Sequence, residues 1–273
     1  MSQNKTVLIT GGGNGIGREL CKCFHNEGYN LIVVSLLMEE LISLRDELNP
    51  LFNGQKIIIF QQDLSDTEAA ESVYAFCEKN KIDIDILVNN VGFGLVGRHI
   101  DLDAARIEQM IILNIMTMTM LCHRFGKRMK ERGSGHILNV ASTSAFQPLP
   151  FWAAYAGTKA YVSSFSQSLA REMKEFGVAV TCLYPGTTAT NFLDYAGLEK
   201  SSSMWSVGSL IHGAAMDAKN VARVGFRNMK KKKLRAIPGI TNKIHFYFVY
   251  CIPNIIITAV VYVFMKRYKQ IGL

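Results

Sequence analysis

Tyr155 and Lys159 are the first residues in this chain whose types and spacing predict chemistry. They stand four residues apart in a segment with helical spacing, 155–176, so they share one face of the predicted helix, one turn apart. A free tyrosine titrates near pH ~10 and is a poor general base at neutral pH. A nearby lysine ammonium favours the phenolate and lowers the pKa of the tyrosine. The pair therefore predicts a tyrosine that transfers a proton as a general acid or base.

Ser142 follows the apolar strand predicted over 136–140 and precedes Tyr155 by 13 residues. Open α/β sheets bind ligands in the crevice at the carboxyl ends of their strands, where this serine lies. Its hydroxyl can donate to a substrate carbonyl and stabilise the alkoxide that develops there. The alternative to a catalytic role is that Tyr155 is an ordinary tyrosine on a helix surface and Ser142 an ordinary turn residue. Their occurrence together with Asn114 and a glycine-rich turn makes that alternative the weaker interpretation.

The glycine-rich turn over 10–17 joins the first predicted strand to the first predicted helix. Glycines in such a turn allow a tight bend and let backbone N–H groups approach a pyrophosphate at the positive end of the helix. Many loops also carry three glycines, so the turn alone is weak evidence. Its place between a buried strand and a helix favours nucleotide binding.

Apolar runs and helically spaced segments alternate through the chain up to residue 183. The strands are predicted over 7–10, 31–35, 56–60, 84–88, 136–140 and 178–183, and the helices over 16–27, 39–48, 67–79, 104–132 and 155–176. This order predicts right-handed βαβ units and an α/β fold with a doubly wound parallel sheet of Rossmann type. No linker or internal repeat interrupts it. We expect a single domain over 1–240, followed by a helical, apolar and basic C-terminal extension over 241–273.

Taken in order, these motifs resemble the short-chain dehydrogenase/reductase family over roughly residues 5–240. The glycine turn has the spacing TGxxxGxG, and Asp63-Leu64 follows the third strand. Asn89-Asn90-Val91-Gly92 follows the fourth strand and departs from the family's NNAG at Val91. The remaining landmarks of the family are Asn114, Ser142, the YxxxK motif from Tyr155 to Lys159, Pro185-Gly186, Thr188 and Thr190.

The resemblance implies an NAD(P)(H)-dependent oxidoreductase that interconverts a ketone and a secondary alcohol, and a homodimer or homotetramer. It assigns Lys159 to the nicotinamide ribose, Asn114 to a water that relays protons, and Asp63 to the adenine. The implied catalytic residues are Asn114, Ser142, Tyr155 and Lys159. The implied cofactor contacts are Thr10, Gly11, Gly13, Asn14, Gly15, Ile16, Gly17, Ser35, Asp63, Leu64, Asn90, Val91, Gly92, Tyr155, Lys159, Pro185, Gly186, Thr188 and Thr190.

The end of the second strand bears on the choice of dinucleotide. An acid there selects NAD(H) by binding the 2′-hydroxyl, whereas a nearby arginine selects NADP(H). Ser35 offers no carboxylate that would repel a 2′-phosphate, but Leu36 stands where an NADP-preferring relative often carries an arginine, and Asn14 is not basic. We expect NADP(H) to be favoured over NAD(H).

Apolar side chains near the motif residues favour a hydrophobic substrate, such as an acyl, sphingoid or steroid-like compound. The segment 187–212, which the family uses as a mobile lid, and the residues that flank the motifs both supply them. The alternative is that most of them only pack the lid. The lid residues are Phe192, Leu193, Tyr195, Leu198, Met204 and Trp205, and the flanking residues are Phe93, Leu95, Phe146, Leu149, Phe151 and Trp152.

Charge is distributed unevenly over a net of +8. Asp217 is the last acidic residue, so the segment 219–273 holds twelve Lys and Arg with no acid, while 1–218 carries 18 basic against 22 acidic residues. Such asymmetry indicates an anionic partner surface. We expect no nucleic acid partner.

The apolar run 246–265 is long enough to span a bilayer, but Pro253-Asn254 interrupts it and basic residues lie at both ends. A hydrophobic hairpin or interfacial helix on anionic lipid fits better than a spanning anchor. The other alternative is a C-terminal helix that completes the substrate pocket or a dimer contact.

The six cysteines form no CxxC pair and show no metal-ligand spacing, so we expect buried thiols and no metal. The N-terminus runs directly into a strand without a signal-peptide pattern, which predicts a cytoplasmic protein, associated at most with the cytoplasmic face of a membrane. Two rivals to an enzyme are a nucleotide-sensing regulator and a membrane-tethered scaffold. A regulator would be expected to lose Tyr155 or Lys159, and both are present.

Overall fold

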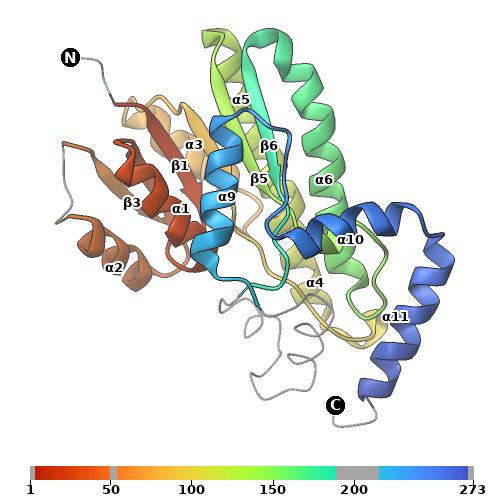
Figure 1. The fold of residues 1–273 in the computed structure, drawn as a ribbon. Coiled ribbons are helices and arrows are strands. Elements are labelled where there is room, and N and C mark those ends of the chain that lie inside the picture. Colours follow the sequence, from red (N-terminus) through yellow and green to blue (C-terminus); the bar gives the residue numbers. More distant parts are fainter. Residues whose placement is uncertain (1–3, 50–53, 189–214, 270–273) are drawn as a thin grey trace.

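The computed structural model describes residues 4–49, 54–188 and 215–269. Its centre is a seven-stranded parallel sheet with the strand order β3-β2-β1-β4-β5-β6-β7 (Figure 1). The predicted α/β fold with one doubly wound parallel sheet is confirmed. The strands are β1 (Thr6–Thr10), β2 (Asn30–Ser35), β3 (Ile57–Gln61), β4 (Ile86–Asn89), β5 (Gly135–Val140), β6 (Val178–Leu183) and β7 (Arg235–Ala236).

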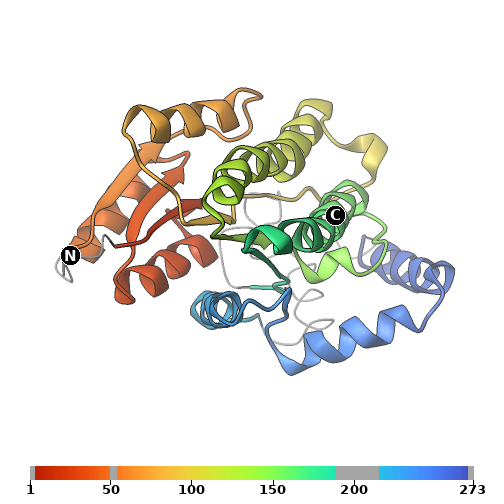
Figure 2. The same ribbon diagram turned by 90° about the horizontal axis from the view of Figure 1, so that it is seen from above.

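Helices cover both faces of the sheet, as the view from above shows (Figure 2). One face packs against α1 (Gly15–Asn26), α2 (Met38–Leu48) and α9 (Ala218–Lys230). The other packs against α3 (Ala69–Lys79), α5 (Met118–Arg132) and α6 (Ala153–Met173). The central strands are buried on both sides, which is why they read as continuous apolar runs rather than as alternating ones.

The sheet changes winding direction between β1 and β4, which are hydrogen-bonded neighbours although almost 80 residues separate Thr10 from its partner Asn89. The loops that follow these two strands therefore lie side by side. The Asn90 amide joins them, because its Nδ2 donates to the carbonyls of Thr10 and Gly11, each at 3.1 Å. Such a reversal of strand order opens a ligand crevice in doubly wound sheets.

The segment predicted as one long helix over 104–132 contains a break in its hydrogen-bond pattern. It consists of α4 (Ala104–Ile111), a π-helical turn η3 (Ile112–Thr117) and then α5. π-Helical turns insert one extra residue into the helix and often occur at functional sites. This one carries Asn114.

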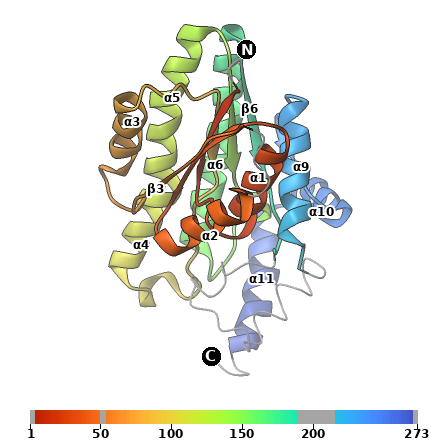
Figure 3. The same ribbon diagram turned by 90° about the vertical axis from the view of Figure 1, so that its left-hand side faces the viewer.

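The C-terminal extension forms two helices, α10 (Ile240–Tyr250) and α11 (Asn254–Lys269), which meet at Pro253 as the sequence predicts. Inward side chains of α10, Phe246 and Val249, belong to the main core. The side view in Figure 3 shows α11 extending past the ends of the strands. Among the described helices, none has the length and apolar character needed to cross a bilayer.

Candidate active site

A cavity of about 700 Å³ lies at the carboxyl ends of the central strands. Its walls come from the loops after β1, β2, β3, β4, β5 and β6 and from α6 and α11. It extends from Ser35 and Leu36 at one end to Ser142 and Tyr155 at the other. The cavity thus borders both the glycine turn and the predicted catalytic residues.

The glycine turn is shaped for close approach of backbone to backbone. Gly11 has φ +64°, and a Cβ added at Gly17 would lie 2.1 Å from the carbonyl oxygen of Gly11. A side chain at Gly17 would therefore force α1 away from the turn. The Asn14 side chain accepts from the Gly15 N–H at 2.6 Å and caps α1. These features fit a dinucleotide pyrophosphate held by the first turn of α1.

A carboxylate that the sequence did not single out lies at the far end of this turn. Glu40 of α2 accepts a hydrogen bond from Asn14 Nδ2 at 3.1 Å. A Cβ added at Gly13 would lie 2.7 Å from Glu40 Oε2 and 3.1 Å from Ser35 Oγ, so the carboxylate and the hydroxyl flank the same small space. Glu40 and Ser35 both line the cavity.

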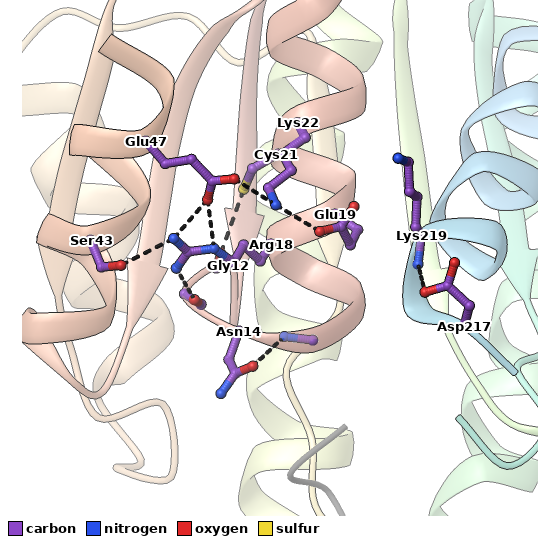
Figure 4. Close-up of polar contacts among 12 residues, drawn as sticks. Gly12, Asn14, Arg18, Glu19, Cys21, Lys22, Ser43, Glu47, Asp217 and Lys219 are labelled. Atoms are coloured by element: carbon purple, nitrogen blue, oxygen red, sulfur yellow. Dashed lines mark hydrogen bonds and ion pairs between the residues drawn. The ribbon is translucent and has the colours of Figure 1, made fainter. Parts of the chain in front are cut away.

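The basic residue nearest to this turn is held by α2 (Figure 4). Arg18 Nη2 lies 2.7 Å from Glu47 Oε2 and 3.1 Å from Ser43 Oγ. Its Nη1 donates to the Gly13 carbonyl at 3.0 Å. Lys22 also pairs with Glu47, at 2.8 Å. The charge of Arg18 is therefore already compensated, and the arginine ties α1 to α2.

Tyr155 and Lys159 lie on the same face of α6, as their spacing predicts, and both are buried. Lys159 Nζ lies 6.0 Å from the centre of the Tyr155 ring and donates to the Val140 carbonyl at 3.0 Å. Ser142 faces the same end of the cavity, and its oxygen accepts from the Ser144 N–H at 3.1 Å. The three predicted residues are thus brought together.

Burial controls the proton affinities of this pair. It raises the pKa of Tyr155 to about 12, although a hydrogen bond with Ser142 acts in the opposite direction. It lowers the pKa of Lys159 to about 8, because the ammonium is removed from water. The sequence predicts instead that Lys159 lowers the pKa of Tyr155. Desolvation by burial is the largest cause of the raised pKa of Tyr155, so the phenol is protonated at neutral pH in this structure.

Asn114 is held by the backbone of Phe93 and the side chain of Thr158, and it is not among the residues that line the cavity. Its Nδ2 donates to the Phe93 carbonyl at 2.9 Å and to Thr158 Oγ1 at 3.0 Å, and its Oδ1 accepts from the Phe93 N–H at 3.2 Å. Gly92 lies next to the Asn114 side chain and to Lys159 Nζ. A Cβ there would be 2.7 Å from Asn114 Oδ1 and 3.2 Å from Lys159 Nζ. The NNVG motif thus leaves the space that Lys159 needs.

The end of the cavity beyond Tyr155 is mainly apolar. Its apolar lining residues are Phe93, Leu113, Leu149, Trp152, Ile257, Val261 and Met265. Gln147 is a polar exception, because it is buried to more than nine tenths and its Oε1 accepts no hydrogen bond from the described residues. Arg106, Gln109 and His245 also reach the wall.

Most of the predicted cofactor residues line the cavity. Three predicted residues, Thr10, Gly13 and Gly17, do not line it and lie next to residues that do. Thr10 Oγ1 accepts from the Asn90 N–H at 3.1 Å. A Cβ at Gly13 would meet Glu40, and a Cβ at Gly17 would meet the Gly11 carbonyl. Thr190 and the predicted lid residues lie outside the described part of the chain. The predicted residues on the cavity wall are Gly11, Asn14, Gly15, Ile16, Ser35, Asp63, Leu64, Asn90, Val91, Gly92, Ser142, Tyr155, Lys159, Pro185, Gly186 and Thr188.

Two of the residues predicted to flank the site, Phe146 and Phe151, are not among the residues that line the cavity. Phe146 packs in the core against Tyr184 and Phe246, and Phe151 stacks on Tyr262 of α11. The sequence analysis missed Glu40, Gln147 and the inward residues of α11. Glu40 and Gln147 are ordinary polar residues without a motif. The apolar pattern of α11 is visible in the sequence, but it does not reveal which side of the helix faces the cavity.

Comparisons with a family model and with solved structures point to the same protein family. A family model described as short chain dehydrogenase matches residues 5–200. The probable oxidoreductase EphD of Mycobacterium tuberculosis is 34% identical over 195 residues, which is 70% of this chain and 32% of that protein. The chain therefore spans about a third of the length of the first curated relatives it matches.

Two solved structures are similar over most of their length. A short-chain dehydrogenase from Sphingobium yanoikuyae in complex with NADPH has a TM-score of 0.78 and 27% identity, covering 86% of this chain and 88% of its own. The bulky-bulky ketone specific alcohol dehydrogenase from Comamonas testosteroni has a TM-score of 0.73 and 26% identity, covering 86% of each chain.

Proposed function

Because this chain belongs to the short-chain dehydrogenase/reductase family, we propose that it is an NAD(P)(H)-dependent oxidoreductase that interconverts a hydrophobic ketone and its secondary alcohol. The observation that carries the proposal is the convergence of Ser142, Tyr155 and Lys159 at one end of a cavity whose other end is a glycine turn. A bound nicotinamide would supply or accept the hydride. The protein supplies the proton and orients the reactants.

Tyr155 is the proton carrier in this proposal. Its raised pKa keeps the phenol protonated at neutral pH, which suits a donor to the alkoxide formed when a ketone is reduced. Ser142 lies within hydrogen-bonding reach of the phenol, which supports a role in which its hydroxyl donates to the same substrate oxygen. Lys159 carries the positive charge that stabilises the phenolate once the proton has left. An oxidised nicotinamide would add to that charge in the reverse direction.

The dinucleotide contacts remain predictions. In this proposal, Ser35 and Glu40 together determine which of the two dinucleotides binds more tightly. Ser35 offers room and a hydroxyl for a 2′-phosphate, which supports the predicted preference for NADP(H). The carboxylate of Glu40 beside the same space opposes a phosphate by like-charge repulsion. We propose that both dinucleotides are accepted and that Glu40 limits the preference for NADP(H).

The substrate is proposed to be bulky and apolar. The lining of the cavity beyond Tyr155 by Trp152, Val261 and Met265 supports this, as does the similarity to an alcohol dehydrogenase specific for bulky ketones. Gln147 supplies an acceptor for a hydroxyl or N–H group on such a substrate. An acyl, sphingoid or steroid-like skeleton remains the prediction, as does a homo-oligomer.

The test is oxidation of NADPH and NADH in the presence of a panel of lipophilic ketones. Tyr155→Phe should lower turnover ~10²–10⁴-fold, because it removes the proton carrier and keeps the ring. The affinity for cofactor, measured by fluorescence titration, should change little. Tyr161→Phe is the matched control, since Tyr161 lies on the same helix and is partly exposed. Near-normal turnover in Tyr155→Phe would refute the mechanism.

A further inference from the structure

The helix α10 carries apolar side chains on two opposite sides. Its inner side, with Phe246 and Val249, packs into the core. Its outer side presents a second stripe at helical spacing, made of Ile240, Ile244, Tyr247 and Phe248. These four side chains are between 61% and 75% exposed. A surface helix normally presents polar residues on that side.

The helix α11 has the same property. Ile257, Val261 and Met265 face the cavity. The outward side is again apolar, with Ile255, Ile256, Val260 and Val263 each more than half exposed. A helix that is apolar all round is ordinarily buried in a protein core or in lipid. We refer to these eight outward residues of α10 and α11 as the C-terminal apolar face.

Most of the exposed large apolar side chains of the described chain gather on these two helices, ten of eighteen. Figures 1 and 3 show that α11 stands at the periphery of the fold, away from the sheet. A concentration of exposed apolar side chains on neighbouring elements is typical of sites of protein or membrane contact. The C-terminal apolar face is therefore an interaction surface.

Charge identifies the partner. Lys243 and Lys266 are exposed on α10 and α11, and Arg235 lies over the Phe246 ring at 5.2 Å. The sequence contains no Asp or Glu after Asp217. Two copies meeting through this face would bring like charges together. A surface with anionic groups over an apolar interior would complement both features.

We propose that the C-terminal apolar face docks on the surface of a membrane that contains anionic lipid. The outward side chains of α10 and α11 enter the boundary between headgroups and acyl chains, and the lysines contact the lipid headgroups. Tyr247, Tyr250 and Tyr262 suit this boundary, because a tyrosine ring is apolar and its hydroxyl remains in water.

One consequence rests also on the proposed function. Because α11 is both a wall of the cavity and part of this face, an apolar substrate dissolved in the membrane would lie one helix away from Tyr155. Docking itself requires no substrate and no turnover. Vesicle binding measured without either therefore tests the docking independently of the reaction.

The experiment is sedimentation of the full chain with vesicles of phosphatidylcholine alone and of phosphatidylcholine mixed with phosphatidylserine. The chain should sediment with the mixed vesicles and less with the neutral ones. High salt should release only part of it, since salt screens the lysines but not the apolar contact. Ile244→Ser with Phe248→Ser should weaken binding at least tenfold. Lys243→Gln with Lys266→Gln should remove much of the dependence on phosphatidylserine.

The matched control is Ile42→Ser with Ile100→Ser, two exposed isoleucines elsewhere on the surface, which should leave vesicle binding unchanged. The thermal unfolding temperature of each double variant should stay close to that of the parent, because all these side chains are exposed. Sedimentation in neither vesicle type would overturn the proposal. So would a dimer that dissociates in Ile244→Ser with Phe248→Ser, since the face would then belong to a second copy.

Discussion

Replacing Glu40 by glutamine should shift the choice of dinucleotide towards NADPH. Glu40 and Ser35 flank the same space next to Gly13, so a 2′-phosphate that reaches the Ser35 hydroxyl lies a few ångströms from the carboxylate. The glutamine side chain keeps the shape and retains an oxygen for the hydrogen bond from Asn14. It removes only the negative charge.

The magnitude follows from the separation and the exposure. Two unit charges ~5 Å apart interact by ~0.8 kcal/mol in water and by ~3 kcal/mol at the effective dielectric constant of a protein surface. Glu40 is partly buried, so a value between these limits applies, and the phosphate carries more than one charge. We expect ~1.5 kcal/mol, or about a tenfold gain in the affinity for NADPH relative to that for NADH.

The assay is titration of each dinucleotide by fluorescence, in wild type, Glu40→Gln and the control Glu39→Gln. Glu39 precedes Glu40 on α2 and is exposed. The ratio of the two dissociation constants should change only in Glu40→Gln, and the change should shrink as salt is added. Equal changes for NADPH and NADH, or the same shift in Glu39→Gln, would show that the carboxylate does not face the 2′-position.

Two further predictions concern the catalytic end of the cavity. In the proposed mechanism, reduction depends on the Lys159 ammonium, and its pKa of about 8 means that rising pH removes this charge. We therefore expect kcat/KM for ketone reduction to be flat at lower pH and to fall above about pH 8, and a profile that rises through this range would contradict the assignment. Gly92→Ala should lower kcat roughly 10²-fold while the protein still folds, because the new Cβ would lie 2.7 Å from Asn114 Oδ1 and 3.2 Å from Lys159 Nζ. Gly157→Ala, on the helix turn between Tyr155 and Lys159 where an added Cβ meets nothing within 4 Å, should leave kcat unchanged, and steady-state kinetics of the two variants make the comparison.

The sheet was largely predictable because each central strand is buried on both sides. Runs such as Val7-Leu8-Ile9 identify these strands almost to the residue, and glycines mark the turn after β1. The last strand could not be found in this way, since β7 contains only Arg235 and Ala236 and offers no pattern. The π-helical turn at Asn114 was also invisible, because one inserted residue hardly alters the apolar spacing of a long helix.

The convergence of the candidate site residues was predictable from the sequence, but their environment was not. Motif spacing indicates that Ser142, Tyr155 and Lys159 lie close together, as the structure shows, yet the raised pKa of Tyr155 depends on burial that no local pattern encodes. Glu40 comes close to the glycine turn only because α2 packs beside α1, through contacts such as Arg18 with Glu47. The break at Pro253 was predicted, whereas the packing of α11 over the cavity was one of several alternatives.

The strand order also constrains how the chain folds during synthesis. In the sheet, β1 lies between β2 and β4, so during synthesis one of its edges has no partner until residues 86–89 have been made. Until then an apolar strand edge is open to pairing with other nascent chains. The edge strand β7 and the cavity-lining helix α11 are translated after the other six strands of the sheet. A ribosome that stalls before β4 therefore leaves an aggregation-prone fragment, and the cavity is complete only after α10 and α11 have emerged.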